Sequence, residues 1–224
     1  MQINIWSDIR CPFCYIGKKN FEEALQQSGL AGEVEVFWRS FELDPNLKVE
    51  EKINYADFFS KAKGISKEQA NSMFDNVVEM GKSVGIHFEL NDAIVANSFD
   101  SHRLIQYAKT ENLAAETVDA VFRAHFLQGK DIDSKDVLLK IAEEVGLNKE
   151  VAKDVLESDK FGDRVRQDEH QAQHIGIKGV PFFVFNDKYA ISGAQPTEAF
   201  LETLQKSFSE FSDERTLTDA KGKQ

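Results

Sequence analysis

Two cysteines separated by two residues are the part of this sequence with the clearest capacity for chemistry. They occur in the segment Cys11-Pro12-Phe13-Cys14, and the 224-residue chain has no other cysteine. A thiolate attacks disulfides whereas a neutral thiol hardly does, so a dithiol catalyst needs its first sulfur ionised near neutral pH. Cys11 would be this nucleophile, and Cys14, within reach one helical turn later, would resolve the mixed disulfide.

A zinc site is the alternative use of this cysteine pair. Two cysteines at this spacing are half of such a site, and His170 and His174 could supply the other half. In compact modules of this kind the two pairs lie about 12–15 residues apart, whereas here most of the chain separates them. We therefore predict a redox dithiol with no metal, and two partly exposed histidines on one helix face.

The elements around the cysteines are predicted to place them at the start of a helix. Residues 2–7 alternate apolar and polar side chains and predict a short buried strand, and residues 33–43 predict a second. Pro12 suits a first helical turn and Ser28-Gly29 ends the apolar periodicity, which predicts a helix over residues 12–28. The free N–H groups and peptide dipoles of its first turn would stabilise an anion at Cys11.

The long middle of the chain, residues 53–175, is expected to be mostly helical. It contains no proline, and glycines such as Gly64, Gly85 and Gly146 divide it into helix-length pieces. Residues 180–185 then favour a strand, Asn186-Asp187 a turn, and residues 189–191 a second short strand. A last helix carries apolar side chains as far as residue 208, and the polar residues from 209 onward are expected to fray.

This order of elements predicts an α/β protein with a thioredoxin fold. The β-α-β half and the β-β-α half would be separated by a large all-helical insertion. The predicted parts are an N-terminal half over residues 1–52, an insertion over 53–160, a C-terminal half over 161–208 and a polar tail over 209–224.

Composition and charge limit the classes of partner. The formal net charge is -11, from 38 acidic and 27 basic side chains, so the molecule repels phosphate backbones and anionic lipid. We expect no nucleic-acid partner, no membrane partner, no cofactor and a monomer. The start of the chain lacks the basic and apolar regions of a signal peptide, which indicates a cytoplasmic protein. A mature form whose signal peptide was removed is the alternative.

Several segments, in order along the chain, resemble the DsbA-like thioredoxin-fold oxidoreductases, most closely their cytosolic FrnE-type branch. They are residues 7–17 around the cysteines, 97–104, 179–183 and 191–195. The resemblance covers nearly the whole chain up to about residue 208. It implies thiol-disulfide exchange with protein or low-molecular-weight substrates, and a partner that recycles the dithiol.

The resemblance also assigns roles to residues outside the cysteine segment. Pro181 resembles the family's cis-proline beside the dithiol, and Val180 would offer its backbone to substrate. Asn97, His102 and Arg103 resemble the start of the insertion helix that faces the site, and with Phe13 they are candidate substrate contacts. The alternative for Asn97, His102 and Arg103 is an ordinary helix cap and a solvated helix face.

Two departures from the family pattern bear on the chemistry. Ile5 stands six residues before Cys11, where thioredoxin-like proteins often carry a buried carboxylate, so that proton relay is not available. Phe13 stands where strongly oxidising periplasmic relatives have a histidine. Without that polar group the couple should be less oxidising, which favours a reductase or isomerase role.

Two other functions compete with this hypothesis. Kappa-type glutathione transferases and hydroxychromene-carboxylate isomerases resemble the chain in fold, but they carry a serine where this sequence has a cysteine. A holdase-like peptide-binding module is the second rival, with Phe13, Trp38 and Phe182 as candidate contacts in an exposed apolar groove. Activity of a Cys11→Ser variant would separate these functions from a dithiol enzyme.

Overall fold

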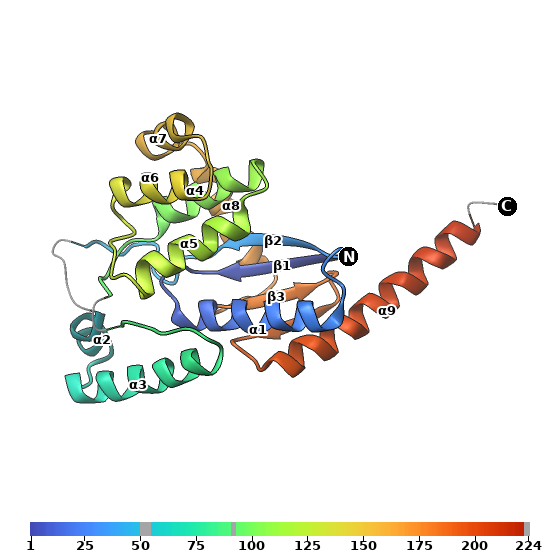
Figure 1. The fold of residues 1–224 in the computed structure, drawn as a ribbon, viewed down its shortest axis with the longest axis horizontal. Coiled ribbons are helices and arrows are strands. Elements are labelled where there is room, and N and C mark those ends of the chain that lie inside the picture. The colour runs from blue at the N-terminus through green and yellow to red at the C-terminus, as the bar shows by residue number, and fades with distance from the viewer. Residues whose placement is uncertain (50–54, 91–92, 222–224) are drawn as a thin grey trace.

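A mixed four-stranded sheet forms the centre of the computed structural model, which describes residues 1–49, 55–90 and 93–221, with side chains through residue 213 (Figure 1). The strands are β1 (Gln2–Ser7), β2 (Glu35–Ser40), β3 (Phe182–Phe185) and β4 (Tyr189–Ser192), in the order β2-β1-β3-β4. Strand β1 pairs parallel with β2 and antiparallel with β3. The two ends of the sequence therefore meet in one sheet, as the predicted thioredoxin fold requires.

One face of the sheet carries an aromatic core. Ile3 and Ile5 of β1 lie opposite Phe185 and Phe183 of β3, and all four are buried. Helices α1 (Pro12–Ser28) and α9 (Thr197–Lys221) pack side by side on this face. The Phe183 ring lies 5.7 Å from that of Phe21 and 4.7 Å from that of Phe200. This packing fixes the axis of α1, and with it the position of the cysteines.

The other face of the sheet packs against helix α8 (Gly162–His174). Trp6 points to this face because side chains alternate along a strand, and it packs with Ala172 of α8. Its indole nitrogen donates to the Asp168 carbonyl at 3.0 Å. Helix α8 is therefore attached directly to the strand that leads to the cysteines.

The Asp168 carboxylate joins α8 to β2 and to helix α4 (Phe99–Thr110). Its two oxygens accept hydrogen bonds from the Ser40 amide at 2.9 Å, from the Gln106 side chain at 2.6 Å and from Arg39 at 3.1 Å. We call these four residues the Asp168 cluster. Because donors engage both carboxylate oxygens, the cluster holds the insertion on the sheet.

The middle of the chain is helical, as predicted. Besides α4 it contains α2 (Tyr55–Lys63), α3 (Lys67–Ser83), α5 (Ala114–Phe126), α6 (Lys135–Glu144) and α7 (Lys149–Glu157). Ser66 and Gln69 form a capping box at the start of α3. The predicted domain boundary at 52/53 lies outside the described residues, and the one at 160/161 falls between α7 and α8.

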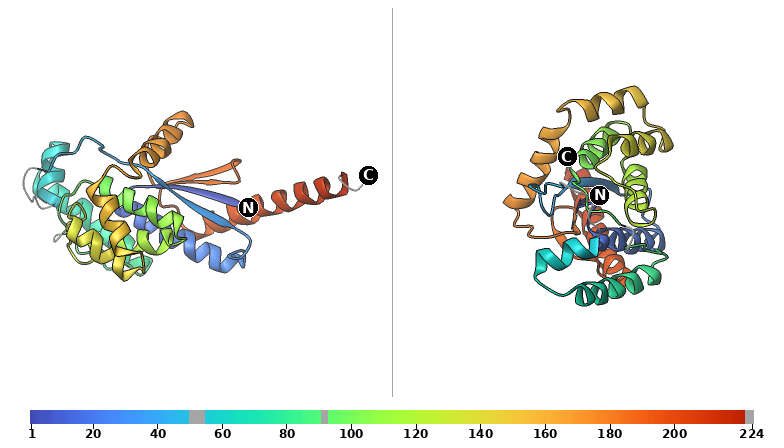
Figure 2. Two further views of the ribbon diagram at one scale, coloured as in Figure 1. Left: turned by 90° about the horizontal axis from the view of Figure 1, so that it is seen from above. Right: turned by 90° about the vertical axis from the view of Figure 1, so that its left-hand side faces the viewer.

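The end of the chain corrects one prediction. Residues 209–221 do not fray but continue α9, which extends beyond the sheet (Figures 1 and 2). This stretch contains no glycine or proline that would stop a helix, and Tyr189 of β4 donates to Glu210. Among the described residues, no helix combines the length and apolar character that a membrane span needs.

Candidate active site

Cys11 occupies the N-cap of α1, where the chain changes from extended backbone to helix. Pro12 follows as the first helical residue, as predicted, and the Cys14 amide donates to the Cys11 carbonyl at 2.9 Å. Cys11 is 6% exposed and Cys14 only 1%. Cys11 is therefore the sulfur that a substrate can reach, and Cys14 lies behind it.

The segment before β3 lies against Cys11. The Val180-Pro181 peptide bond is cis, and the Cys11 Sγ lies 3.7 Å from the Val180 carbonyl oxygen, to which it donates. A Cβ on Gly17 would come within 3.0 Å of the Pro181 ring, so glycine at this position allows α1 to approach the proline. The structure thus brings together Cys11, Val180 and Pro181, three of the predicted site residues.

Cys14 has the environment of a protonated thiol. Burial, and next the neighbouring Cys11, raise the pKa of Cys14 well above its ordinary value of 9.0. Ser7 and the Asp8 backbone oppose this rise because they favour the thiolate. The surroundings of Cys14 therefore favour the neutral thiol over the thiolate.

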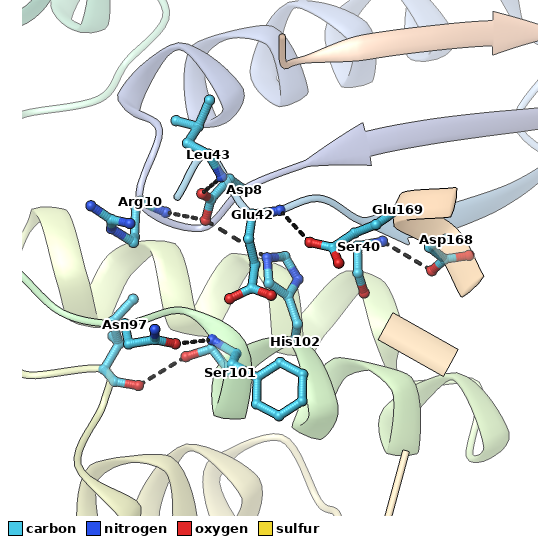
Figure 3. Close-up of polar contacts among 12 residues, drawn as sticks. Asp8, Arg10, Ser40, Glu42, Leu43, Asn97, Ser101, His102, Asp168 and Glu169 are labelled. Carbon is cyan, nitrogen blue, oxygen red and sulfur yellow. Dashed lines mark hydrogen bonds and ion pairs between the residues drawn. The ribbon is translucent and has the colours of Figure 1, made fainter. Parts of the chain in front are cut away.

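Asp8 is a buried carboxylate in the loop that connects β1 to the cysteines. Its oxygens accept from the Arg10 amide at 3.0 Å and the Leu43 amide at 2.8 Å, and one lies 3.7 Å from His102 Nε2 (Figure 3). Burial alone would raise the pKa of Asp8, but His102, Arg10 and the Leu43 amide together hold that pKa below its ordinary value. The aspartate is therefore ionised although no solvent reaches it.

Glu42 brings a second buried carboxylate to His102. Figure 3 shows the side chains of Asp8, Glu42 and His102 converging from three segments. Burial raises the pKa of Glu42, although His102 and Arg166 oppose the rise. Together with Ser7 and Arg10, these three residues form what we call the Asp8 cluster. Ser7, Asp8, Arg10 and Glu42 were not among the site residues predicted from the sequence.

The remaining predicted site residues have separate roles. The Asn97 side chain accepts from the Phe99 amide at 2.8 Å and donates to the Leu47 carbonyl, so it stabilises the turn that leads into α4. Arg103 is 4% exposed and donates to the carbonyls of Val155, Ser158 and Lys160. Its guanidinium is thus engaged by the α7–α8 connection, and we do not include it among substrate contacts.

Phe13 is the predicted site residue with the most exposed side chain. It is 40% exposed and lies between the two cysteines in the sequence. Leu43, 50% exposed, is held beside Asp8 by its own amide. Trp38, named as a contact of a peptide-binding groove, is buried at 5% exposure, which corrects that assignment. Phe182 is partly covered and packs in the Trp6 core.

The described part of the chain contains no group of three His, Cys, Asp or Glu side chains arranged to hold a metal ion. His170 and His174 both lie on α8, and both are exposed rather than partly exposed as predicted. The Cys11 sulfur instead contacts the Val180 carbonyl oxygen. Among the residues that the structure describes, His170 and His174 therefore do not group with the two cysteines.

Comparisons with known proteins agree with this geometry. Residues 2–205 match the model of the DSBA-like thioredoxin domain. The chain belongs to the DSBA-like thioredoxin family. This membership supports thiol-disulfide oxidoreductase chemistry at the level of the family, and it confirms the resemblance to the DsbA-like oxidoreductases and the thioredoxin fold inferred from the sequence.

Individual relatives cover the chain along nearly its whole length. A Bacillus subtilis protein of uncharacterised function, YwbO, is 29% identical over 91% of this chain and 96% of its own length. The crystal structure of SCO1869 from Streptomyces coelicolor, described as a probable DsbA oxidoreductase, has a TM-score of 0.89 at 36% identity, covering 94% of this chain and 91% of that one.

More distant solved structures share the fold alone. A 2-hydroxychromene-2-carboxylate isomerase has a TM-score of 0.68 at 17% identity, covering 96% of this chain and 98% of its own. The cytosolic disulfide reductase DsbM from Pseudomonas aeruginosa, in a structure with GSH, has a TM-score of 0.66 at 18% identity, covering 92% and 100%.

Proposed function

We propose that this protein is a thiol-disulfide oxidoreductase in which Cys11 attacks a substrate disulfide and Cys14 resolves the mixed disulfide. The observation that carries the proposal is the position of Cys11 at the N-cap of α1, 3.7 Å from the carbonyl that precedes Pro181. The helix N-terminus stabilises the attacking thiolate. A substrate segment bound along Val180 would present its sulfur to Cys11.

The direction of electron flow in this proposal is reduction or isomerisation. Phe13 supplies no polar group to stabilise the reduced form, and a weakly stabilised thiolate makes a weaker oxidant. A reducing compartment such as the cytoplasm suits this direction. The fold neighbour DsbM is described as a cytosolic disulfide reductase. We expect a reduction potential well below the roughly −120 mV of the strongest oxidants of this kind, to be measured by equilibration with glutathione.

Trapping distinguishes the two cysteines. After reaction with oxidised glutathione, Cys14→Ser should retain glutathione on Cys11, which mass spectrometry detects. Cys11→Ser is the matched control, and it should neither retain glutathione nor reduce insulin. Retained insulin reduction in Cys11→Ser would contradict the proposal.

A binding module and an isomerase of the hydroxychromene-carboxylate type remain the competing functions. The exposed side chains of Phe13 and Leu43 are the observation that favours peptide binding. Suppression of aggregation that persists in Cys11→Ser, without disulfide exchange in the unmodified protein, would favour the binding module. The isomerases carry a serine where this sequence has a cysteine. The presence of both Cys11 and Cys14 therefore favours the dithiol enzyme.

A further inference from the structure

The Asp8 cluster contains buried polar atoms that make no well-formed hydrogen bond with any described residue. They are Ser7 Oγ, Arg10 Nε and Nη1, Glu42 Oε1 and His102 Nε2. Buried polar groups are nearly always paired, so a concentration of unpaired ones behind a reactive dithiol needs an explanation. The nearby Asp168 carboxylate, by contrast, is fully engaged.

Ser7 and His102 line the same small cavity. Its volume is about 10 Å³, and its other walls are Arg39 and Ser40 together with the apolar side chains of Ile9, Trp38, Ile105 and Val118. This is about the space that one water molecule needs. On its other side, Ser7 lies close enough to Cys14 to favour the thiolate. Ser7 therefore lies between the Cys14 sulfur and the cavity that His102 also lines.

We propose that Ser7 and His102 relay the proton that leaves Cys14 when it resolves a mixed disulfide, with Asp8 and Glu42 stabilising the protonated imidazole. The proposal rests on the proposed function, because it concerns the second step of the same reaction. His102 touches neither substrate nor the reacting sulfurs. It is a positioning residue that acts through Ser7, rather than the substrate contact that the sequence suggested.

The step balances in protons and electrons. The Cys14 thiol passes its proton to Ser7 Oγ while the Ser7 proton moves across the cavity to His102 Nε2. The Cys14 thiolate then attacks the Cys11 sulfur and forms the Cys11-Cys14 disulfide. The bond from Cys11 to the substrate sulfur breaks, and that sulfur leaves with the electron pair as a thiolate. The dithiol is oxidised and the substrate disulfide is reduced.

Charged groups from three segments determine how His102 can carry this proton. Against the effect of burial, His102, the Arg10 charge and the Leu43 amide lower the pKa of Asp8, so Asp8 stabilises an imidazolium rather than taking the proton itself. Glu42 faces the imidazole with one oxygen that no described residue engages. Three segments bring charged groups to His102 or to the residues around it. They are Asp8 and Arg10 in the loop before α1, Arg39 in β2 with Glu42 just after it, and Arg166 and Glu169 on α8.

Reaction with 5,5′-dithiobis(2-nitrobenzoate) separates the two steps. Attack by Cys11 on this aromatic disulfide releases one coloured thiolate, and attack by Cys14 on the resulting mixed disulfide releases a second. Stopped-flow absorbance of the full-length protein measures both rates. If the unmodified protein releases neither thiolate, the proposed function is wrong. If a variant keeps the rate of the first release and changes only that of the second, the proposed function stands and the result bears on the relay.

His102→Gln should leave the first release unchanged and slow the second roughly 10²-fold at neutral pH, the lower end of what general bases contribute. The deficit should shrink at alkaline pH, where hydroxide removes the Cys14 proton directly. Ser7→Ala should behave in the same way and provides a second test if His102→Gln does not fold. A second release that is unchanged in both variants, or slowed equally at every pH, would overturn the relay.

His125 supplies a matched control. It is also a buried histidine, on α5, but it lies beside Phe126 and does not line the cavity. Burial lowers the pKa of His125 to about 4, so it is neutral at neutral pH. His125→Gln should keep both release rates within about 2-fold, within the range of ordinary context effects. A loss of the second release equal to that of His102→Gln would contradict the relay.

Discussion

The Asp168 cluster and the Asp8 cluster use similar side chains for different ends. Both join β2, or the residues just after it, to helices α4 and α8. In the first, donors engage both carboxylate oxygens at 2.6 to 3.1 Å. In the second, His102 stands 3.7 Å from Asp8, and several polar atoms have no described partner. A saturated cluster fixes geometry, whereas an unsaturated one beside Cys14 can exchange protons.

Removal of Asp168 should have the largest effect on stability. Asp168→Ala leaves Arg39 and the Ser40 amide without their acceptor, and loss of one partner of a buried ion pair costs about 3–5 kcal/mol. Urea unfolding measures this loss. At temperatures where the variant stays folded, both thiolate releases should keep their normal rates. A loss of stability below about 1 kcal/mol would show that the cluster does not anchor the insertion.

Two positions one turn apart on α4 sharpen the comparison. Gln106→Leu removes donors to Ser40 and Asp168, and should reduce the free energy of unfolding by about 1–3 kcal/mol with normal exchange rates. His102→Gln should cost less than about 1 kcal/mol, because His102 Nε2 makes no direct hydrogen bond to a described residue. Urea unfolding of both variants checks this. Equal losses of stability would remove the distinction between the clusters.

The smallest predicted effect is a pair of opposite pH dependences within the Asp8 cluster. The pKa of Asp8 is lowered from 3.8, so its ionised form stabilises the fold above that pH and loses this contribution as pH falls further. The pKa of Glu42 is raised from 4.5, so its contribution is present below that pH and is lost as pH rises.

Urea unfolding across this pH range tests both signs. The unmodified protein should be more stable than Asp8→Asn, and this difference in the free energy of unfolding should shrink below about pH 3.8, the ordinary pKa of an aspartate. Stability relative to Glu42→Gln should instead fall as pH rises above about 4.5. If the stability difference from the unmodified protein changed with pH in the same direction for both variants, the pKa values of Asp8 and Glu42 would not be shifted in opposite directions.

Local sequence signals predicted most of the elements. The helix over residues 12–28 was confirmed at both ends, because Pro12 and Gly29 carry strong local preferences. The turn at Asn186-Asp187 was also confirmed, and both residues have the positive φ that such hairpin turns require. The continuation of α9 beyond residue 208 was missed, because polar residues do not stop a helix in the absence of glycine or proline.

The position of Cys11 and Cys14 at a helix start and the thioredoxin order of elements could be predicted from the sequence, because they depend on spacing and local preference. Which distant side chains stand behind Cys14 depends on tertiary packing and could not be predicted. Ser7 and Glu42 lie near His102 because the C-terminal ends of β1 and β2 approach α4. Arg103, one residue from His102, points to α7 instead. Consecutive residues on a helix point in different directions, so the packing of α4 determines which of the two side chains lies near the cysteines.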